Sequence, residues 1–360
     1  MKLILSPDTP GHRIAPEVQS SFAEHLGRCI YGGIWVGEDA RVEHVEGYRA
    51  GVLEALKKLQ LPALRWPGGC FADLYHWRDG IGPREQRPVR HNHWWPMPED
   101  NAFGTHEFLR FCELAEAEPY IALNVGTGSP QESHEWVEYV NSPQDTTLTR
   151  LRKANGREKP WGVKLWGIGN ESWGCGGLLD PVTYADEVRR HINFLHGSAA
   201  AGSRFIIAGG HHGIPEWEDQ LLARLGAARN LVHGFSPHCY AGIHPPLAVE
   251  ECRDCTKLPD WGHEHYIGQL NLLEQLLGRA CGLAQSFSAR GNRLGVYLDE
   301  WSIWHPEATS QNGLWQQVTL GDTLWAAEAF HIMHEHAQWL DMAAIAQTAN
   351  VLQAKVITRG

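Results

Sequence analysis

Short apolar runs alternate with longer amphipathic stretches along the whole chain. The apolar runs predict strands at residues 63–66, 119–125, 163–168, 204–208, 231–236, 294–298 and 342–346, with an eighth within 22–34. The stretches between them place apolar residues every three or four positions and predict helices at 47–60, 105–117, 183–201, 266–283 and 319–338. Strands that alternate with helices in this way indicate repeated βα units.

Eight such units in one chain favour a (β/α)8 barrel, the TIM-barrel class of α/β fold. An open doubly wound sheet is less favoured, because no G-x-G-x-x-G fingerprint follows the first predicted strand. In a barrel, functional side chains gather at the carboxyl ends of the strands. The polar residues that follow each apolar run are therefore the candidates for chemistry.

Two of these strand ends carry adjacent polar and acidic residues. Asn170 and Glu171 follow the 163–168 run, and Glu300, with Trp301 behind it, follows the 294–298 run. Three βα units separate the two glutamates, so they can face each other across the barrel mouth. Two facing carboxyl groups are what glycoside hydrolysis requires, one as proton donor and one as nucleophile or base.

Two further strand ends favour a carbohydrate ligand. Arg65 precedes a Pro-Gly-Gly turn that lets the backbone approach a ligand closely, and its guanidinium can orient a carboxylate. His238 and Tyr240 end the 231–236 strand, where an imidazole and a phenol can hydrogen-bond a carboxylate. The 16 tryptophans suit the flat, half-apolar faces of sugars.

Composition limits the partners. The formal net charge of −11 disfavours nucleic acid, because phosphate binding needs a basic surface. No apolar run approaches the roughly 20 residues that span a bilayer, so no membrane partner is expected. The opening residues lack the apolar core and cleavage site of a signal peptide, which predicts a cytoplasmic protein. The 8 cysteines form no compact framework, so we expect reduced thiols.

Several long motifs resemble glycoside hydrolase family 51, the retaining α-L-arabinofuranosidases. They are SSFAEHLGRCIYGGIW, RWPGGCFADLYHWRDGIGPREQRP, WWPMPEDNAFGTHEF, WGIGNESWGCGG, LDEWSIWHP and IAQTANVLQ. The resemblance covers almost the whole chain. It implies a barrel whose catalytic glutamates end strands four and seven, and release of terminal L-arabinofuranose from arabino-oligosaccharides or arabinose-substituted polysaccharides without a cofactor.

The resemblance also implies roles for individual residues. Glu171 corresponds to the acid/base and Glu300 to the nucleophile. The expected substrate-binding residues are Glu24, Cys70, Asn170, Tyr240, Gln347 and Trp95, and the expected supporting residues are Arg65, His238 and Trp301. Cys70 stands where some members carry asparagine, and a thiol is the poorer hydrogen-bond partner.

Family members usually carry a β-sandwich domain beyond the barrel, and this domain is expected to be absent here. We therefore divide the chain into residues 1–15, a strand segment that would join the sandwich, and residues 16–360, the catalytic barrel. Residues 2–5 are expected to be disordered or paired with another chain. Family members commonly form hexamers, which implies a homo-oligomer.

Two alternatives remain open at this point. One is another activity of the same clan, endo-β-1,4-glucanase or β-xylosidase, and the other is a non-catalytic sugar-binding barrel. Retention of Asn170, Glu171 and Glu300 argues against the second.

A separate motif is a metal candidate. Cys252 and Cys255 form a C-x2-C pair, and His263 and His265 follow closely, which gives four potential zinc ligands. The spacing between the two pairs is shorter than in most zinc modules, so these residues are candidates only for a structural zinc site, and no cofactor is expected for the reaction.

Overall fold

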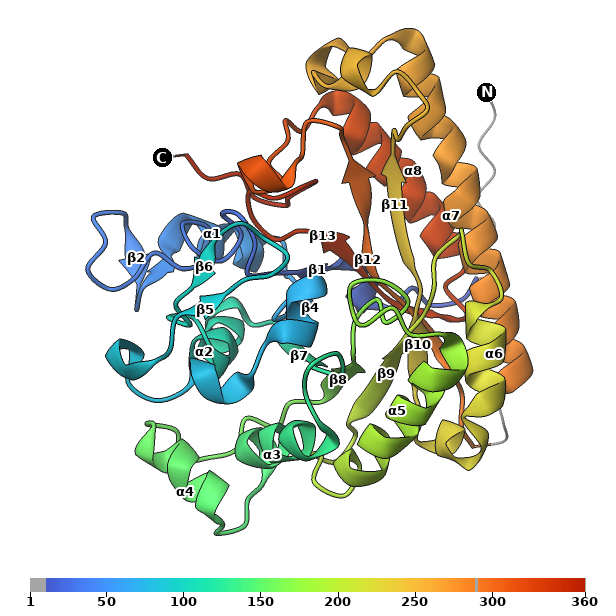
Figure 1. The fold of residues 1–360 in the computed structure, drawn as a ribbon. Coiled ribbons are helices and arrows are strands. Elements are labelled where there is room, and N and C mark those ends of the chain that lie inside the picture. Colours follow the sequence, from blue (N-terminus) through green and yellow to red (C-terminus); the bar gives the residue numbers. More distant parts are fainter. Residues whose placement is uncertain (1–10, 289–290, 360) are drawn as a thin grey trace.

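The computed structural model describes residues 11–288 and 291–359, which form a closed barrel of parallel strands surrounded by helices (Figure 1). In the order in which the strands lie side by side, the main sheet runs β10-β9-β8-β7-β4-β1-β13-β12-β11, and pairing of β10 with β12 closes it. When β10 and β11 are counted as one strand divided at Pro237, at least one helix links each pair of barrel strands that are consecutive in the chain. The (β/α)8 prediction is confirmed.

The sheet strands are β1 (Ser20–Phe22), β4 (Ala63–Trp66), β7 (Glu118–Leu123), β8 (Leu165–Ile168), β9 (Arg204–Ala208), β10 (Gly234–Ser236), β11 (His238–Gly242), β12 (Gly295–Trp304) and β13 (Leu340–Ala346). The helices are α1 (Ala50–Lys58), α2 (Thr105–Ala115), α3 (Pro130–Asn141), α4 (Thr147–Ala154), α5 (Pro181–Leu195), α6 (Trp217–Arg224), α7 (Asp260–Phe287) and α8 (Leu320–Glu335). Two small hairpins pair β2 (His44–Val45) with β3 (Tyr48–Arg49) and β5 (Arg90–His91) with β6 (Pro98–Glu99).

The sixth barrel strand is divided at Pro237, and this division affects the seventh. β10 pairs with the beginning of β12, and β11 pairs with its end, where His238 lies opposite Glu300. The sequence predicted that the seventh strand ends at residue 298, before Glu300. That boundary is wrong, because pairing with β11 extends β12 through Trp304. Glu300 therefore projects from within a strand.

The helices predicted from periodicity are all present with shifted ends, and α3, α4 and α6 are additional. Two of the additional helices, α3 and α4, begin at local capping signals. Ser129 caps α3 by accepting a hydrogen bond from the Glu132 amide, with Pro130 at the first helical position. Thr146 caps α4 in the same way.

Side chains fill the interior of the barrel below the site. Ala63, Tyr120, Leu165, Ile206, Tyr297 and Met342 form a buried cluster contributed by six different strands. A larger apolar core lies between the sheet and the surrounding helices. The Tyr120 hydroxyl donates to Asp299 (2.6 Å), so the interior layer is bonded directly to the base of the site.

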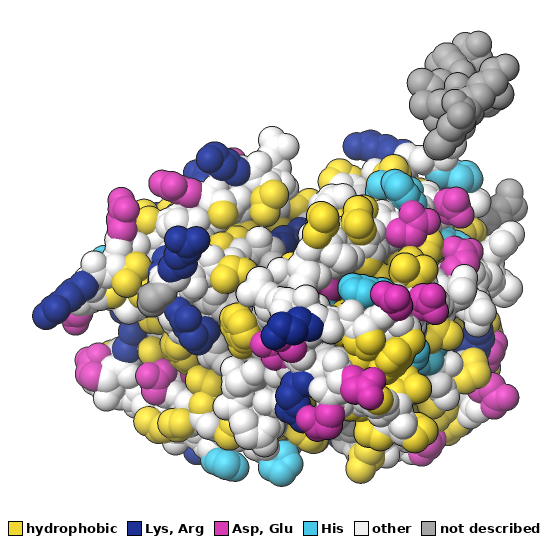
Figure 2. Space-filling model, turned by 90° about the horizontal axis from the view of Figure 1, so that it is seen from above, with side chains coloured by type: hydrophobic (Ala, Val, Ile, Leu, Met, Phe, Trp, Pro, Cys, Tyr) yellow, Lys and Arg dark blue, Asp and Glu magenta, His cyan; other side chains and the backbone are white. Residues whose placement is uncertain are grey.

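The charge of the surface and the character of the helices can be compared with the expectation of neither a nucleic-acid nor a membrane partner. On the face shown in Figure 2, acidic, basic and hydrophobic side chains are interspersed. Among the described residues, none of the helices, including the 28-residue α7, combines the length and apolar character of a membrane span. The strand expected at residues 2–5 lies outside the described residues.

Candidate active site

The two predicted catalytic glutamates meet at the mouth of the barrel. Glu171 follows β8, the fourth barrel strand, and Glu300 lies in β12, the seventh. Carboxylate oxygens of the two residues lie within 4.8 Å of each other. Glu171 has a φ of +39°, which is uncommon for a residue other than glycine and persists where the surrounding structure holds it. Glu171 is partly exposed, whereas Glu300 is buried.

Both carboxylate oxygens of Glu300 accept hydrogen bonds. Arg65 donates from Nη1 to Oε1 (2.8 Å), and the Tyr240 hydroxyl donates to Oε2 (2.8 Å). Burial raises the pKa of Glu300, and the neighbouring Glu171 adds to this, while the cations His238 and Arg65 oppose it. Donors on both oxygens favour the ionised carboxylate.

His238 bridges the acidic groups. Its Nδ1 lies 2.9 Å from Glu171 Oε1, and its Nε2 lies 2.9 Å from Asp299 Oδ1. Burial by itself would lower the pKa of His238, but Glu300, Asp299 and Glu171 outweigh it and raise this pKa to about 10. His238 is therefore an imidazolium at neutral pH, and it donates to both Glu171 and Asp299.

Arg65 links three strand ends. Besides Glu300, its guanidinium donates from Nη2 to Asn170 Oδ1 (2.6 Å), and its Nε lies 3.3 Å from Asp299 Oδ2. The Arg65 side chain is only 2% exposed. Although burial alone would raise it, Arg65 and His238 hold the pKa of Asp299 well below its usual range. The cation thus fixes Asn170 next to Glu300.

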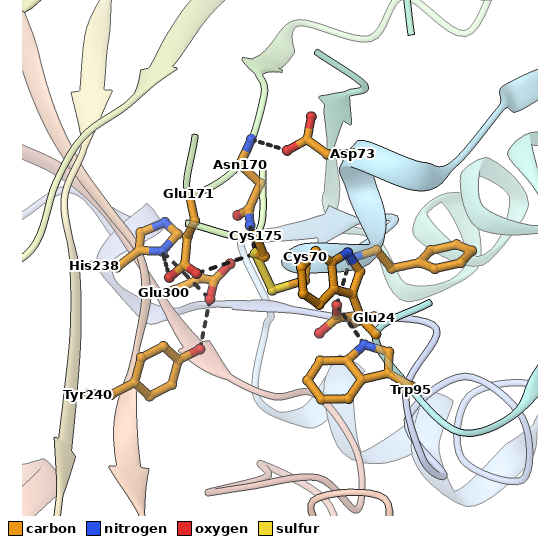
Figure 3. Close-up of a disulfide and its surroundings, with 12 residues drawn as sticks. Glu24, Cys70, Asp73, Trp95, Asn170, Glu171, Cys175, His238, Tyr240 and Glu300 are labelled. Carbon is orange, nitrogen blue, oxygen red and sulfur yellow. Dashed lines mark hydrogen bonds and ion pairs between the residues drawn. A yellow bond between two sulfur atoms is a disulfide. The ribbon is translucent and has the colours of Figure 1, made fainter. Parts of the chain in front are cut away.

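Glu24 lies on the other side of the Cys70 and Cys175 side chains from this group (Figure 3). It accepts hydrogen bonds from the Phe71 amide (3.0 Å), Trp95 Nε1 (3.1 Å) and Gln347 Nε2 (3.0 Å). Burial, together with the charge of Glu300, raises the pKa of Glu24 to about 7 despite these donors. The structure thus brings together the predicted residues Glu24, Trp95 and Gln347.

The Pro-Gly-Gly turn lies against both sets of carboxylates. A Cβ on Gly69 would be 3.0 Å from Glu300 Oε1 and 3.4 Å from Glu24 Oε2. Gly68 has a φ of +147°, and a Cβ there would lie 2.3 Å from Glu24 Cγ. Only glycine fits at Gly68, because a side chain would be strained as well as crowded.

Cys70 differs from the expectation. The structure joins Cys70 and Cys175 in a disulfide across 105 residues, so these two thiols are not free, although reduced thiols were expected throughout the chain. Figure 3 shows the disulfide between the Glu171–Glu300 group and the Glu24–Trp95 group. Cys175 Sγ lies 3.5 Å from Glu171 Oε2. A disulfide sulfur carries no proton, so Cys70 cannot donate to a ligand as a thiol would.

Trp301 is buried away from the carboxylates. Its ring packs against Trp325 and Phe330 of α8, with ring centroids 6.2 and 5.2 Å away. Because neighbouring residues of a strand face opposite sides, Trp301 packs β12 against the helix layer while Glu300 faces Arg65 and Tyr240.

The four metal candidates do not form a cluster. Among the described residues, the groups of three or more potential ligands that lie close together are Cys70–Glu171–Cys175 and Glu171–His238–Glu300. The Cys255 thiol instead donates to the Gln317 carbonyl (3.0 Å), and His265 Nε2 bonds the Gly242 carbonyl (3.2 Å). Cys255 and His265 are thus hydrogen-bonded to backbone carbonyls of other segments rather than directed at one another.

Sequence reasoning missed the role of Asp73. Its Oδ1 accepts from the Val125 and Gly126 amides (2.7 and 2.8 Å), and its Oδ2 accepts from the Asn170 amide (2.9 Å). Burial raises the pKa of Asp73 to about 6. Asp73 thus ties the segments that follow β7 and β8 together at the Asn170 amide. The available signal was an acidic residue just after the Pro-Gly-Gly turn.

Comparisons with known proteins agree with this geometry. A family model described as the α-L-arabinofuranosidase 1 domain matches residues 55–200, and one described as the α-L-arabinofuranosidase C-terminal domain matches residues 299–360. An intracellular exo-α-L-arabinofuranosidase of Bacteroides ovatus is 41% identical over 355 residues, which cover 97% of this chain and 67% of that protein. The chain belongs to glycoside hydrolase family 51. The region of this family 51 chain that the C-terminal model matches includes α8 and β13 of the barrel. The C-terminal domain of that family model is therefore partly present in this chain.

Solved structures of arabinofuranosidases are similar to the family 51 chain as well. The family 51 arabinofuranosidase of Xanthomonas axonopodis pv. citri is 38% identical with a TM-score of 0.91, over 98% of this chain and 71% of that one. The α-L-arabinofuranosidase of Thermotoga maritima, solved with arabinose, is 32% identical with a TM-score of 0.77, over 97% and 67% of the two chains.

Proposed function

We propose that this protein is a retaining, exo-acting α-L-arabinofuranosidase that releases terminal L-arabinofuranose from arabino-oligosaccharides or arabinose-substituted polysaccharides. The observation that carries the proposal is the pair of carboxylates within 4.8 Å, one buried and bonded at both oxygens and the other partly exposed. Retaining glycosidases have carboxyl groups about 5–5.5 Å apart, whereas inverting enzymes need about 6.5–9.5 Å to admit a water molecule.

Glu300 acts as the nucleophile in this proposal. Arg65 and Tyr240 stabilise its ionised form, and one of its oxygens attacks the anomeric carbon. Glu171 protonates the departing oxygen. His238 occupies Glu171 Oε1, whereas the described residues place only the Cys175 sulfur against Oε2, so Oε2 carries the transferred proton.

The second step uses the same residues in reverse. Glu171 takes a proton from water, the water oxygen attacks the glycosyl-enzyme, and Glu300 leaves. Asn170, held by Arg65, binds the hydroxyl next to the reacting carbon, and Glu24 with Gln347 binds hydroxyls farther round the furanose. Trp95 lines the exit beside Glu24.

The name of the Bacteroides ovatus relative includes the word intracellular, and this supports a proposal about the cellular compartment. We propose the same compartment for this chain and, as a further prediction, a homo-oligomer. Residues 1–15 and 16–360 remain our proposed division of the chain.

The test of roles compares Glu171→Ala and Glu300→Ala on two aryl arabinofuranosides, one with a dinitrophenyl leaving group and one with a poor leaving group. Glu171→Ala should lose less activity on the dinitrophenyl substrate than on the substrate with the poor leaving group. Deglycosylation should then limit turnover, and azide should raise turnover by replacing the water that lacks a base. Glu300→Ala should lose several orders of magnitude on both. Equal loss in Glu171→Ala on both substrates, without azide rescue, would refute the roles. NMR of the first-formed arabinose tests retention separately.

A further inference from the structure

The Cys70–Cys175 disulfide connects two loops that both carry the site. Cys70 directly follows the Gly68–Gly69 turn, and Cys175 lies four residues beyond Glu171. Both cysteines and Glu171 are partly exposed, so a reductant or an ion can reach them from the barrel mouth. The two sulfurs and a Glu171 oxygen lie within 4.8 Å of one another.

Reduction would convert this bridge into two thiols. A dithiol reductant transfers two electrons and two protons to the disulfide: the S–S bond breaks, both sulfurs become thiols, and the reductant becomes a disulfide. Disulfides are rare in reducing compartments, so this bridge faces that reaction wherever thiol reductants are present.

The freed groups match the preferences of a soft divalent ion. Zn2+ binds thiolates at about 2.3 Å and carboxylate oxygens at about 2.0–2.2 Å in tetrahedral geometry, which puts two bound sulfurs about 3.8 Å apart. The Cα atoms of the two cysteines are 5.4 Å apart, so side-chain rotation alone can open the sulfurs to that spacing. Water would complete the tetrahedron.

Among the described residues, the site contains the cations Arg65 and His238 and the carboxyl groups of Glu24, Asp73, Glu171, Asp299 and Glu300. A divalent cation is favoured most above about pH 7, where Glu24 and Asp73 are ionised as well. Bound thiolates would add negative charge next to Glu171. A zinc ion there would also hold the Glu171 oxygen that delivers the proton.

We propose that reduction of Cys70–Cys175 creates an inhibitory site for a thiophilic divalent cation such as Zn2+, held by both thiolates and the Glu171 carboxylate. The inhibition rests on the proposed function, because it acts by removing the acid/base. Metal binding itself does not depend on catalysis. The oxidised protein lacks the two thiolates and cannot form the site.

The experiment measures both properties on the whole chain. The protein is reduced with a phosphine, desalted without air and compared with the oxidised protein. Co2+ reports thiolate ligation through a near-ultraviolet charge-transfer band, and Zn2+ is titrated in an aryl-arabinofuranoside assay. We expect a new cobalt band only after reduction. Zinc should cut the activity of the reduced protein about tenfold at about 10 μM, as a Kd of about 1 μM gives, and a chelator should restore it.

Matched variants separate this site from other thiols. Cys70→Ser/Cys175→Ser should show neither the reduction-dependent band nor the zinc response. Cys252→Ser/Cys255→Ser, which removes two buried free cysteines, should keep both. If the serine variants fail to fold, the oxidised and reduced wild-type proteins still decide the question.

Two results would overturn the proposal. Absence of a reduction-dependent cobalt band would show that the thiols do not bind metal. Equal zinc inhibition of both redox states would place the ion on Glu171, His238 and Glu300, which also lie within 4.8 Å of one another. If the protein hydrolyses no arabinofuranoside in either state, the proposed function fails, while the cobalt result still judges the site.

Discussion

Glu24→Gln should stabilise the fold at pH 8 while weakening catalysis. The buried carboxyl has a pKa of about 7 in the folded protein, against an ordinary value of 4.5. The folded protein thus binds this proton more tightly than the unfolded chain does. Stability is therefore lost as the pH rises from about 4.5 to about 7, and the ionised Glu24 costs the fold about 3 kcal/mol above that range.

Glutamine removes this cost without disturbing the packing. Its oxygen can accept from Phe71 and Trp95, as Glu24 Oε1 does. Its amide can donate to Gln347 Oε1, a buried oxygen that has no hydrogen-bond partner among the described residues, once that side chain turns over. The substitution should therefore be tolerated sterically.

The assay is thermal unfolding of wild type and Glu24→Gln at pH 5 and pH 8. For 360 residues, about 2.1 cal/mol/K per residue converts about 3 kcal/mol into a Tm increase of about 4 °C at pH 8. At pH 5 the increase should nearly vanish, because Glu24 is then protonated in wild type. The kcat/KM should fall at least tenfold at both pH values. An identical Tm change at pH 5 and pH 8 would refute the reasoning.

Glu99→Gln is the matched control of opposite sign. Glu99 is also buried, but its Oε2 lies 2.7 Å from His25 Nδ1. Burial alone would raise the pKa of Glu99, yet His25 and Tyr31 outweigh it and lower this pKa. A lowered pKa stabilises the fold above the ordinary value, and that stability is lost as the pH falls. Glu99→Gln should therefore lower the Tm at pH 8.

Three further substitutions test individual contacts. Gly69→Ala places a methyl group 3.0 Å from Glu300 Oε1 and should reduce kcat at least tenfold with little change in Tm, as steady-state kinetics beside calorimetry would show. Arg65→Lys replaces the planar fork that donates to Glu300 and Asn170 with a single ammonium on a shorter side chain, so kcat/KM should drop about 100-fold. Near-normal kinetics would contradict this link. Asp73→Asn turns an acceptor of the Asn170 amide into a donor and should lower both Tm, by about 2 °C, and kcat, whereas a change in Tm alone would restrict Asp73 to a structural role.

The strand pattern was predictable where burial on both faces produces continuous apolar runs. Residues 63–66 and 204–208 were predicted with their observed bounds. The end of β12 was not, because its last residues include Asp299, Glu300 and Ser302, which are polar yet buried inside the barrel mouth. Polarity normally marks a loop, and only pairing with β11 shows otherwise.

The site was predictable in its residues but not in its connections. Strand-end position and family motifs identified Glu171, Glu300 and Arg65, since each adjoins an apolar run. The Cys70–Cys175 bridge joins residues that only the closed barrel brings together, so their spacing carries no signal. Conversely, the short spacing of Cys252 and Cys255 suggested a site that the fold does not form.

Arg65 bonds Glu300, Asn170 and Asp299, and it does so away from the segment that carries Trp95. One guanidinium on β4 bonds Glu300 on β12 and Asn170 just after β8, so all three positions lie in or directly after barrel strands. Trp95, by contrast, sits on the segment between β5 and β6. Mutations in such segments can change which leaving groups the pocket accepts without moving the reacting residues. The protein is therefore suited to directed evolution toward new polymer branches, with diversity confined to that rim and the guanidinium left untouched.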